Sequence, residues 1–331
     1  VLGENHPYTF ETLNNLAQLK EDLGMLEEAF EIRKTGFERR NIFFDRILWV
    51  AGDNTRQSYI RLHKPEQDAY IRLLLKLDDE RTALELFRLS LKRKGLLLKM
   101  TSETQQVVKL SGSPKLQKLT EELTSVRKEL AALTLSGPTP ENRDRFGEMV
   151  YELEEKINSL QLQLGASSQV YRQTLAQATP EEIMDGLGDS AVVDFLAYRG
   201  DEDVLNLLAV VGYAGEWQFI DYGEMEFIRE MIVELREIIQ DEGAMDEDIK
   251  YVAYDLWGPL WSPLMEYTGD AESIFIVPDS VLNVLPFDVL VDDSESYLIE
   301  NTNLRIIGSA RDLVLTPLEP SQGVMLILAG P

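Results

Sequence analysis

The clearest pattern of hydrophobic and polar positions lies between residues 114 and 165, where apolar residues recur at intervals of three and four. The first seam is Leu116, Leu119, Leu123, Val126, Leu130 and Leu133, and the second is Phe146, Val150, Leu153, Ile157, Leu160 and Leu164. Residues 136–140, with one glycine and two prolines, separate them. This spacing predicts an antiparallel helical hairpin packed like a coiled coil. Such a hairpin acts either as a passive spacer or as an arm that moves when a partner binds.

The C-terminal half changes to short apolar runs rich in β-branched residues, which favour strands. Strands are expected at residues 191–198, 204–211, 217–221, 274–277, 297–300 and 304–308. The first two are joined by the acidic turn 200–203 and form a hairpin. A helix is expected from Phe227 to Ile239, and a second one from Val252 to Leu264 with an interruption at Gly258-Pro259. Thr179 and Pro180 carry the signals of a helix start. This half is therefore predicted to be an α/β domain.

The first hundred residues follow helical spacing throughout. Leu13 and Ala17 lie on one helix, Gly24 breaks the pattern, and a second helix starts at Leu26. Between residues 41 and 100 the helical spacing continues without a clean repeat, with one helix reaching Leu62 and the next beginning near Pro65. The boundaries predicted from these changes are a helical segment at 1–100, a hairpin linker at 101–170 and an α/β domain at 171–331.

Particular residues in the α/β half form a recognisable order of motifs. They are Pro278, Asp279, Leu282, Leu285, Pro286, Phe287, Leu290, Tyr297, Leu298, Glu300, Ser309, Ala310 and Leu313. This order resembles the CHAT domain, a caspase-like domain found attached to tetratricopeptide repeats. Ser280 departs from the family, which usually has glycine there, so a less tight turn is expected after Asp279.

We interpret the motif residues Pro278, Asp279, Leu285, Pro286, Phe287 and Ser309 as structural. Asp279 is a turn residue after a strand, with the ordering of a loop beside an active site as a further role. Ser309 is a helix cap and not a nucleophile, because no histidine lies in this half.

The N-terminus resembles the longer tetratricopeptide repeat of kinesin light chains, through residues 2–9, residues 13–17, Gly24 and residues 28–29. Lys20 and Arg33 stand where that family prefers aromatic residues, which indicates the last repeat of an array. The fold class implied is α + α/β: a TPR-like helical segment, an antiparallel helical hairpin and the first half of a caspase-like domain. Because the chain begins inside a repeat motif and ends with an apolar run at 324–329, we expect a fragment truncated at both ends. A truncated sheet would expose apolar surface, so association or dye binding is expected.

Charge narrows the range of partners. The net charge is −26, and residues 181–250 hold 20 acidic against 4 basic residues. Such a chain repels nucleic acid and anionic membranes, and the acidic stretch is either a solvated surface or a docking surface for a basic partner. The basic group at residues 92–94, with Lys99, is expected to pair internally or to close a helix C-terminus. No apolar run approaches membrane-spanning length.

The sequence lacks the side chains that thiol hydrolysis requires. It contains no cysteine, and its two histidines are His6, interpreted as a motif residue in a turn, and His63, interpreted as a surface residue. Phosphate-binding loops and metalloprotease motifs are absent, and residues 241–248 lack the spacing of a calcium loop. We therefore assign no catalytic, cofactor-binding or metal-binding residue and no cofactor, and expect no peptidase activity from this chain. The lack of cysteine favours a cytoplasmic location.

By resemblance, the intact protein would be a bacterial-type caspase-like cysteine endopeptidase, regulated by a protein or peptide partner at its repeats. The alternative is a non-catalytic interaction scaffold. A histidine and a cysteine encoded after Pro331, each following an apolar strand, would favour the peptidase.

Overall fold

The computed structural model describes residues 7–50, 53–94, 112–136, 138–139, 142–172 and 178–314. For residues 7–8, 43–50, 53–56, 131, 134–136 and 166–172 it describes the backbone path but not the side-chain environment. The predicted apolar run at 324–329, His6 and Lys99 lie outside the described residues.

The N-terminal segment consists of helices. α1 (Pro7–Asp22) and α2 (Leu26–Val50) form the expected helix–turn–helix, with Gly24 at a φ of +73° in the turn. They are followed by α3 (Asp53–Leu62), α4 (Lys64–Leu77), which has Pro65 in its first turn as predicted, and α5 (Thr82–Arg93). The single helix expected to reach Leu62 is two helices, α2 and α3. The sequence between them contains Gly52, a poor helix former.

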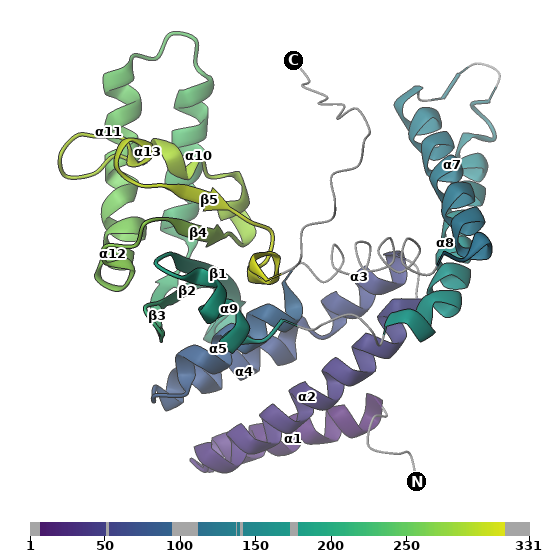
Figure 1. The fold of residues 1–331 in the computed structure, drawn as a ribbon, viewed down its shortest axis with the longest axis horizontal. Helices are drawn as coiled ribbons and strands as arrows, with labels where there is room; N and C mark the ends of the chain where they lie inside the picture. The colour runs from purple at the N-terminus through teal and green to yellow at the C-terminus, as the bar shows by residue number, and fades with distance from the viewer. Residues whose placement is uncertain are drawn as a thin grey trace.

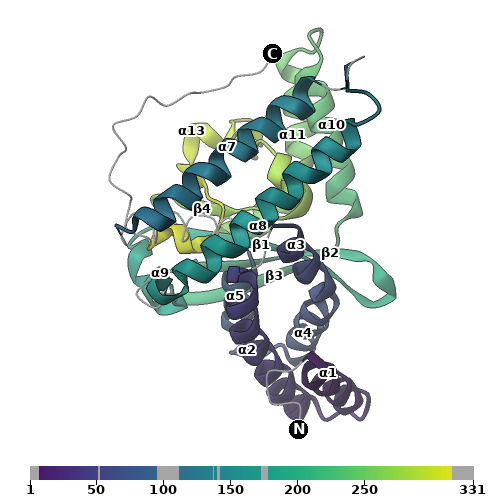
Figure 2. The same cartoon turned by 90° about the vertical axis from the view of Figure 1, so that its right-hand side faces the viewer.

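The predicted hairpin is present as two helices lying side by side, α7 (Pro114–Ser136) and α8 (Phe146–Arg172) (Figure 1, Figure 2). Five members of the two apolar seams are buried between them: Leu116, Leu123, Val126, Leu160 and Leu164. Tyr59 and Ile60 of α3 pack against this cluster and connect the hairpin to the N-terminal helices. The coiled-coil character of the packing stays a prediction. Among the described helices, none is both long and apolar enough to cross a membrane.

The C-terminal region is built on a mixed five-stranded sheet with the order β3-β2-β1-β4-β5. Its strands are β1 (Ala191–Arg199), β2 (Leu205–Tyr213), β3 (Glu216–Glu224), β4 (Ile274–Val277) and β5 (Leu304–Ile306). β1, β2 and β3 pair antiparallel, which confirms the expected hairpin, whereas β1, β4 and β5 are parallel. β1 is buried on both faces along its first eight residues, because helices cover both sides of the sheet.

One face of the sheet is covered by helices that lie between β3 and β4 in the sequence. These are α10 (Glu226–Gln240), α11 (Asp246–Leu256), the π-helical turn Trp257–Trp261 and α12 (Ser262–Thr268). The predicted interruption at Gly258-Pro259 is therefore not a break but a wider turn within a continuous helical path. A π-turn suits this position because Pro259 has no N–H to donate to a regular ladder.

The opposite face is covered by residues from distant parts of the chain. Buried side chains of α2, α4, α5 and α9 (Pro180–Leu187) form one cluster with Val192, Leu196, Leu208 and Val210 of the sheet. Figure 1 shows α4, α5 and α9 beside the sheet. Thr179 and Glu182 form a capping box at the start of α9. The N-terminal helices and the α/β region thus share a hydrophobic core.

The prediction of a strand at residues 297–300 is wrong. Tyr297 makes only an isolated bridge to Val291, and Leu298–Asn301 is the short helix α13. The chain turns back at this point because Asp292 Oδ1 accepts hydrogen bonds from Ser294 N (2.9 Å) and Ser296 N (3.1 Å).

Candidate functional site

In sheets with parallel strands, ligands and catalytic groups lie outside the carboxyl ends of the strands. Here those ends belong to β1, β4 and β5, and the chain leaves β4 through Pro278-Asp279 and passes after β5 to Ser309 and Arg311. The motif residues Pro278, Asp279 and Ser309 therefore come to one edge of the sheet. This edge is the candidate functional site.

Asp279 ties the end of β4 to its neighbour β1. Its Oδ2 accepts a hydrogen bond from Ala197 N (2.9 Å), and its Oδ1 accepts one from Ser280 N (2.8 Å) at the start of the 3-10 helix η3 (Ser280–Val284). Ser280 has a φ of +52°. The expectation of a looser turn is wrong, because Ser280 adopts the left-handed conformation that glycine occupies without strain.

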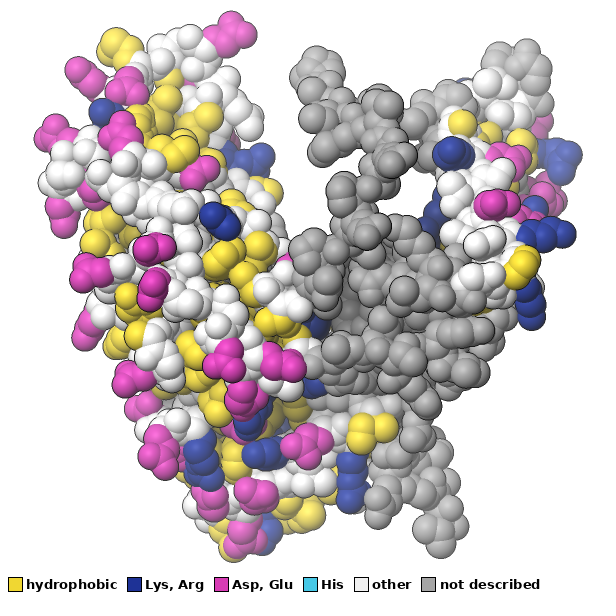
Figure 3. Space-filling model, in the orientation of Figure 1, with side chains coloured by type: hydrophobic (Ala, Val, Ile, Leu, Met, Phe, Trp, Pro, Cys, Tyr) yellow, Lys and Arg dark blue, Asp and Glu magenta, His cyan; other side chains and the backbone are white. Residues whose placement is uncertain are grey.

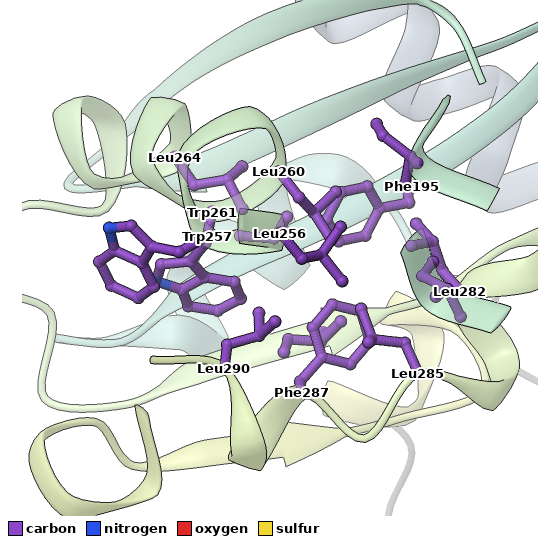
Figure 4. Packing of buried hydrophobic residues seen from close by; sticks show 14 of the residues in the cluster. Phe195, Leu256, Trp257, Leu260, Trp261, Leu264, Leu282, Leu285, Phe287 and Leu290 are labelled. Atoms are coloured by element: carbon purple, nitrogen blue, oxygen red, sulfur yellow. The ribbon is translucent and has the colours of Figure 1, made fainter. Parts of the chain in front are cut away.

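We assign a packing role, and no chemical role, to Leu285, Pro286 and Phe287. Pro286 precedes the 3-10 helix η4 (Phe287–Val289), and the Phe287 side chain is fully buried. Its ring stacks on Phe195 of β1 (centroids 6.0 Å apart) and meets Trp261 edge-on (6.2 Å). Figure 4 shows these rings together in the cluster beneath the sheet. The chain after η3 is therefore anchored to the sheet by an aromatic side chain.

Ser309 lies at the start of the 3-10 helix η5 (Ala310–Leu313) and is buried. Its Oγ accepts from Arg311 N (3.4 Å), and its N–H donates to Asp312 Oδ2 (3.2 Å), so the two side chains form a capping box. The hydroxyl is thus used within its own turn and is not presented to solvent.

A buried ion pair lies against the same strands, and sequence reasoning did not identify it as a pair. Lys94, at the C-terminal end of α5, donates from Nζ to Asp194 Oδ1 (2.7 Å), to Val277 O (2.8 Å) and to Phe195 O. Ser90 Oγ donates to the other carboxylate oxygen of Asp194 (2.7 Å). Asp194 is 1% exposed, and burial raises the pKa of its carboxyl although the Lys94 charge acts in the opposite direction.

Arg311 fastens the loop after β5 to the same helix end. Its guanidinium donates to Leu91 O and to Lys94 O (2.6 Å), which are carbonyls in the last turn of α5 and at its C-cap. Helix C-terminal carbonyls lack intrahelical partners, so a buried arginine satisfies them well. The expectation that the basic group at 92–94 pairs internally is confirmed for Lys94.

One signal for this cluster was present in the sequence. Asp194 is the single charged residue inside the apolar run 191–198, and an ionised group buried in a central strand requires a partner. The identity of that partner, 100 residues away in the chain, had no local signal.

This cluster does not leave a reactive side chain free to act on a substrate. Ser90 and Asp194 are buried, the Ser90 hydroxyl donates to Asp194, and Asp194 also accepts from Lys94. Among the described residues, no group of three or more histidine, cysteine or acidic side chains is arranged to hold a metal ion. This arrangement can fix the position of strands and loops, but it does not present a nucleophile to a substrate.

His63 is not the surface residue that the sequence suggested. Its ring stacks on Tyr59 (centroids 6.3 Å apart), and its Nδ1 lies 3.1 Å from Glu66 Oε2, which also pairs with Arg40. These neighbours leave the side chain 14% exposed. It lies in the helical segment, at the junction of α3 and α4.

The acidic stretch 181–250 lies mainly on the outside of the α/β region. Figure 3 shows acidic side chains spread over that part of the molecule, while basic side chains are more frequent lower down and on the hairpin at the right, mixed there with acidic ones. Exposed members include Glu230, Glu234 and Glu237 on α10, opposite the face that packs on the sheet. This is the distribution of an amphipathic surface helix.

Comparison with known proteins identifies one region. Residues 250–331 match the family model of the CHAT domain. Within the described residues, the match extends from α11 through the Pro278-Asp279 turn, β5 and η5 to Val314. No curated protein matches the chain.

Proposed function

We propose that the α/β region is a caspase-like CHAT domain and that the intact protein is a cysteine endopeptidase controlled through its helical segment. One observation carries the proposal. The matched region includes the turn at Pro278-Asp279, which lies at the carboxyl ends of parallel strands, where an α/β domain places its chemistry. The same edge is held by a helix of the N-terminal segment through Lys94.

The helical segment is proposed to act as the regulatory part. Its helices α4 and α5 share a core with the sheet, so a partner that moves them also disturbs the strands. In this proposal the partner is a protein or peptide that binds the TPR-like helices, and the location is cytoplasmic. Direct contact with nucleic acid or a membrane surface is disfavoured by the net charge of −26.

The proposal needs a nucleophile that this sequence does not contain. A thiol hydrolase uses a cysteine thiolate and a nearby histidine. The 331 residues include no cysteine, and both histidines lie in the first 63 residues. We therefore assign the catalytic pair to a longer polypeptide and expect no thiol-dependent cleavage by the 331-residue chain.

The test begins with the coding region that follows Pro331. The peptidase proposal expects a histidine and a cysteine there, each after an apolar strand, and iodoacetamide-sensitive cleavage of protein substrates by the longer protein. Replacing that cysteine by alanine should abolish cleavage. Thiol-sensitive turnover by the 331-residue chain alone, or a longer protein without such a pair, would overturn the proposal.

A second candidate is a non-catalytic interaction scaffold. It is favoured by the hydrogen bonding at the candidate edge, where Asp279, Asp194 and Ser309 all bind groups of the chain itself. The two candidates separate in a binding experiment with the longer protein. A scaffold would retain its partners and show no cleavage with or without iodoacetamide.

A further inference from the structure

Lys94 connects three parts of the molecule at one nitrogen atom. It is the C-cap residue of α5, and its Nζ reaches Asp194 and Phe195 of β1 and Val277, the last residue of β4. The next two residues after Val277 are Pro278 and Asp279, which begin the loop at the candidate edge. The end of β4 is therefore fixed from the side of the helical segment.

The loop after β5 is attached to the same helix end. Arg311 donates to Leu91 O and Lys94 O of α5, and Ser309 shapes the turn that carries Arg311. Two loops that follow neighbouring parallel strands thus converge on the last turn of one helix. A movement of α5 along its axis changes the positions of both attachments.

The neighbouring helix α4 makes polar contacts with a different part of the sheet. Lys64 Nζ donates to Ala197 O (2.8 Å), and Arg72 donates to Arg199 O (2.7 Å). Both acceptors lie toward the far end of β1, beyond the last residue of β1 that pairs with β4, which is Asp194. Arg72 therefore holds α4 to the sheet without touching the loops after β4 or β5, whereas Lys64 binds the residue whose N–H donates to Asp279.

We propose that Lys94 is a positioning residue that transmits the position of the helical segment to the loops after β4 and β5. This statement deepens the proposed function, because it names the residue through which the helices would control the candidate edge. Lys94 does not touch a substrate in this scheme. It acts through the strand end that it holds.

Burial of the ion pair gives the connection its all-or-none character. Withdrawal of α5 would take away both Ser90 and Lys94, the side-chain donors that the structure shows for the buried Asp194 carboxylate, which is strongly unfavourable. Partial displacement is therefore disfavoured, and the helix and the strand ends shift together. Coupling of this kind is reciprocal, so a ligand at the candidate edge also changes the energetics of moving α5.

The test is hydrogen exchange with mass spectrometry on the 331-residue chain. The variant Lys94→Met/Asp194→Leu removes both charges, so neither is left buried alone. We expect amides of residues 278–290 and 309–314 to exchange about tenfold faster, with β2 and the α7–α8 hairpin unchanged. The urea midpoint, measured in parallel, should stay close to that of the wild type.

Two further variants separate positioning from general stabilisation. Arg72→Met removes a contact between α4 and β1 and should leave exchange at residues 278–290 unchanged. Lys94→Gln/Asp194→Asn retains a side-chain amide that can donate to the same carbonyls, and it should restore most of the protection. If Lys94→Met/Asp194→Leu lowers the urea midpoint, a variant that keeps an acceptor for Ser90, Lys94→Met/Asp194→Asn, takes its place. Its exchange rates are then compared with those of Lys94→Gln/Asp194→Asn.

Unchanged exchange at residues 278–290 in a folded Lys94→Met/Asp194→Leu variant would overturn the proposal. An equally large effect of Arg72→Met would overturn it as well. The readout does not depend on peptidase activity. Failure of the peptidase proposal would leave these exchange results standing, and failure of the coupling would not decide whether the longer protein cleaves peptides.

Discussion

Replacement of Lys94 by methionine tests how the buried ion pair contributes to stability. The substitution removes the donor to Asp194 Oδ1, which lies 2.7 Å from Nζ, and leaves Ser90 as the remaining donor that the structure shows for that carboxylate. Asp194 is 1% exposed, so water cannot replace the lost partner without opening the core. Removing one member of a buried pair typically costs about 3–5 kcal/mol.

A double-mutant cycle separates the interaction energy between Lys94 and Asp194 from the cost of each single substitution. Asp194→Leu alone leaves Lys94 with two carbonyl acceptors and a side chain that is 12% exposed, so its cost should be about 2–4 kcal/mol, at or below that of Lys94→Met. The double variant buries two apolar side chains and should lie within about 1 kcal/mol of the wild type. The two single costs, about 5–9 kcal/mol together, therefore should not add, and the coupling energy should be at least about 4 kcal/mol.

The Lys94→Met deficit should also depend on pH. Burial raises the pKa of Asp194, and loss of the lysine charge removes a factor that lowers it. A carboxyl with a raised folded-state pKa binds a proton more readily in the folded protein than in the unfolded chain. Its destabilising effect is therefore full above the folded pKa, and decreases as the pH falls through that pKa toward the unfolded value of about 3.9.

Urea unfolding followed by circular dichroism, at pH 8 and at pH 5, measures all four proteins of the cycle. The deficit of Lys94→Met should be larger at pH 8 than at pH 5, while the double variant should show little difference. A loss below about 1 kcal/mol for Lys94→Met at pH 8, or a double variant as unstable as the sum of the singles, would refute the reasoning.

Three further substitutions test local features. Ser280→Gly should stabilise the chain by about 0.5–1 kcal/mol in urea unfolding, because Ser280 has a φ of +52°, whereas Ser280→Ala should bring no gain. Gly212→Ala should cost about 1–3 kcal/mol, because its Cβ would overlap the ring of Trp217, and adding Trp217→Leu should relieve the loss. Arg81→Met should lower the melting temperature slightly at neutral pH and low salt. Arg81 lowers the pKa of the exposed Glu27 carboxyl by hydrogen bonding, so this stabilisation is present above the unfolded pKa and is lost as the pH falls through the lowered one. The difference should also vanish in about 1 M NaCl, and its persistence there would contradict an electrostatic origin.

Much of the local structure was determined by the sequence itself. The apolar seams specified helices α7 and α8, and the short β-branched runs specified β1, β2 and β4 close to their observed limits. The helices follow from a 3.6-residue periodicity and the strands from short apolar runs rich in β-branched residues, and both signals are visible within one segment without knowledge of the neighbours. The division at residues 100 and 170 stays a prediction, although helices from the first segment share a core with the sheet.

Local reasoning was least reliable where a side chain or a turn redirects the backbone. The run at 297–300 has the composition of a strand, but the turn organised by Asp292 leads it into a helix. Ser280 shows the opposite case, because the hydrogen bonds and packing around Asp279 hold it in a conformation that its own propensity disfavours. In both places hydrogen bonds to an aspartate side chain outweigh preferences of about 1 kcal/mol per residue.

The sequence by itself determined that a charged residue, Asp194, lies within an apolar strand. Only the tertiary structure decided that Lys94 lies beside it and that the same nitrogen reaches the end of β4. Hydrophobic periodicity states which face of an element is buried, but not which distant element covers that face. The choice depends on the packing of whole surfaces and on pairing every buried charge, conditions that are met only when the complete chain has folded.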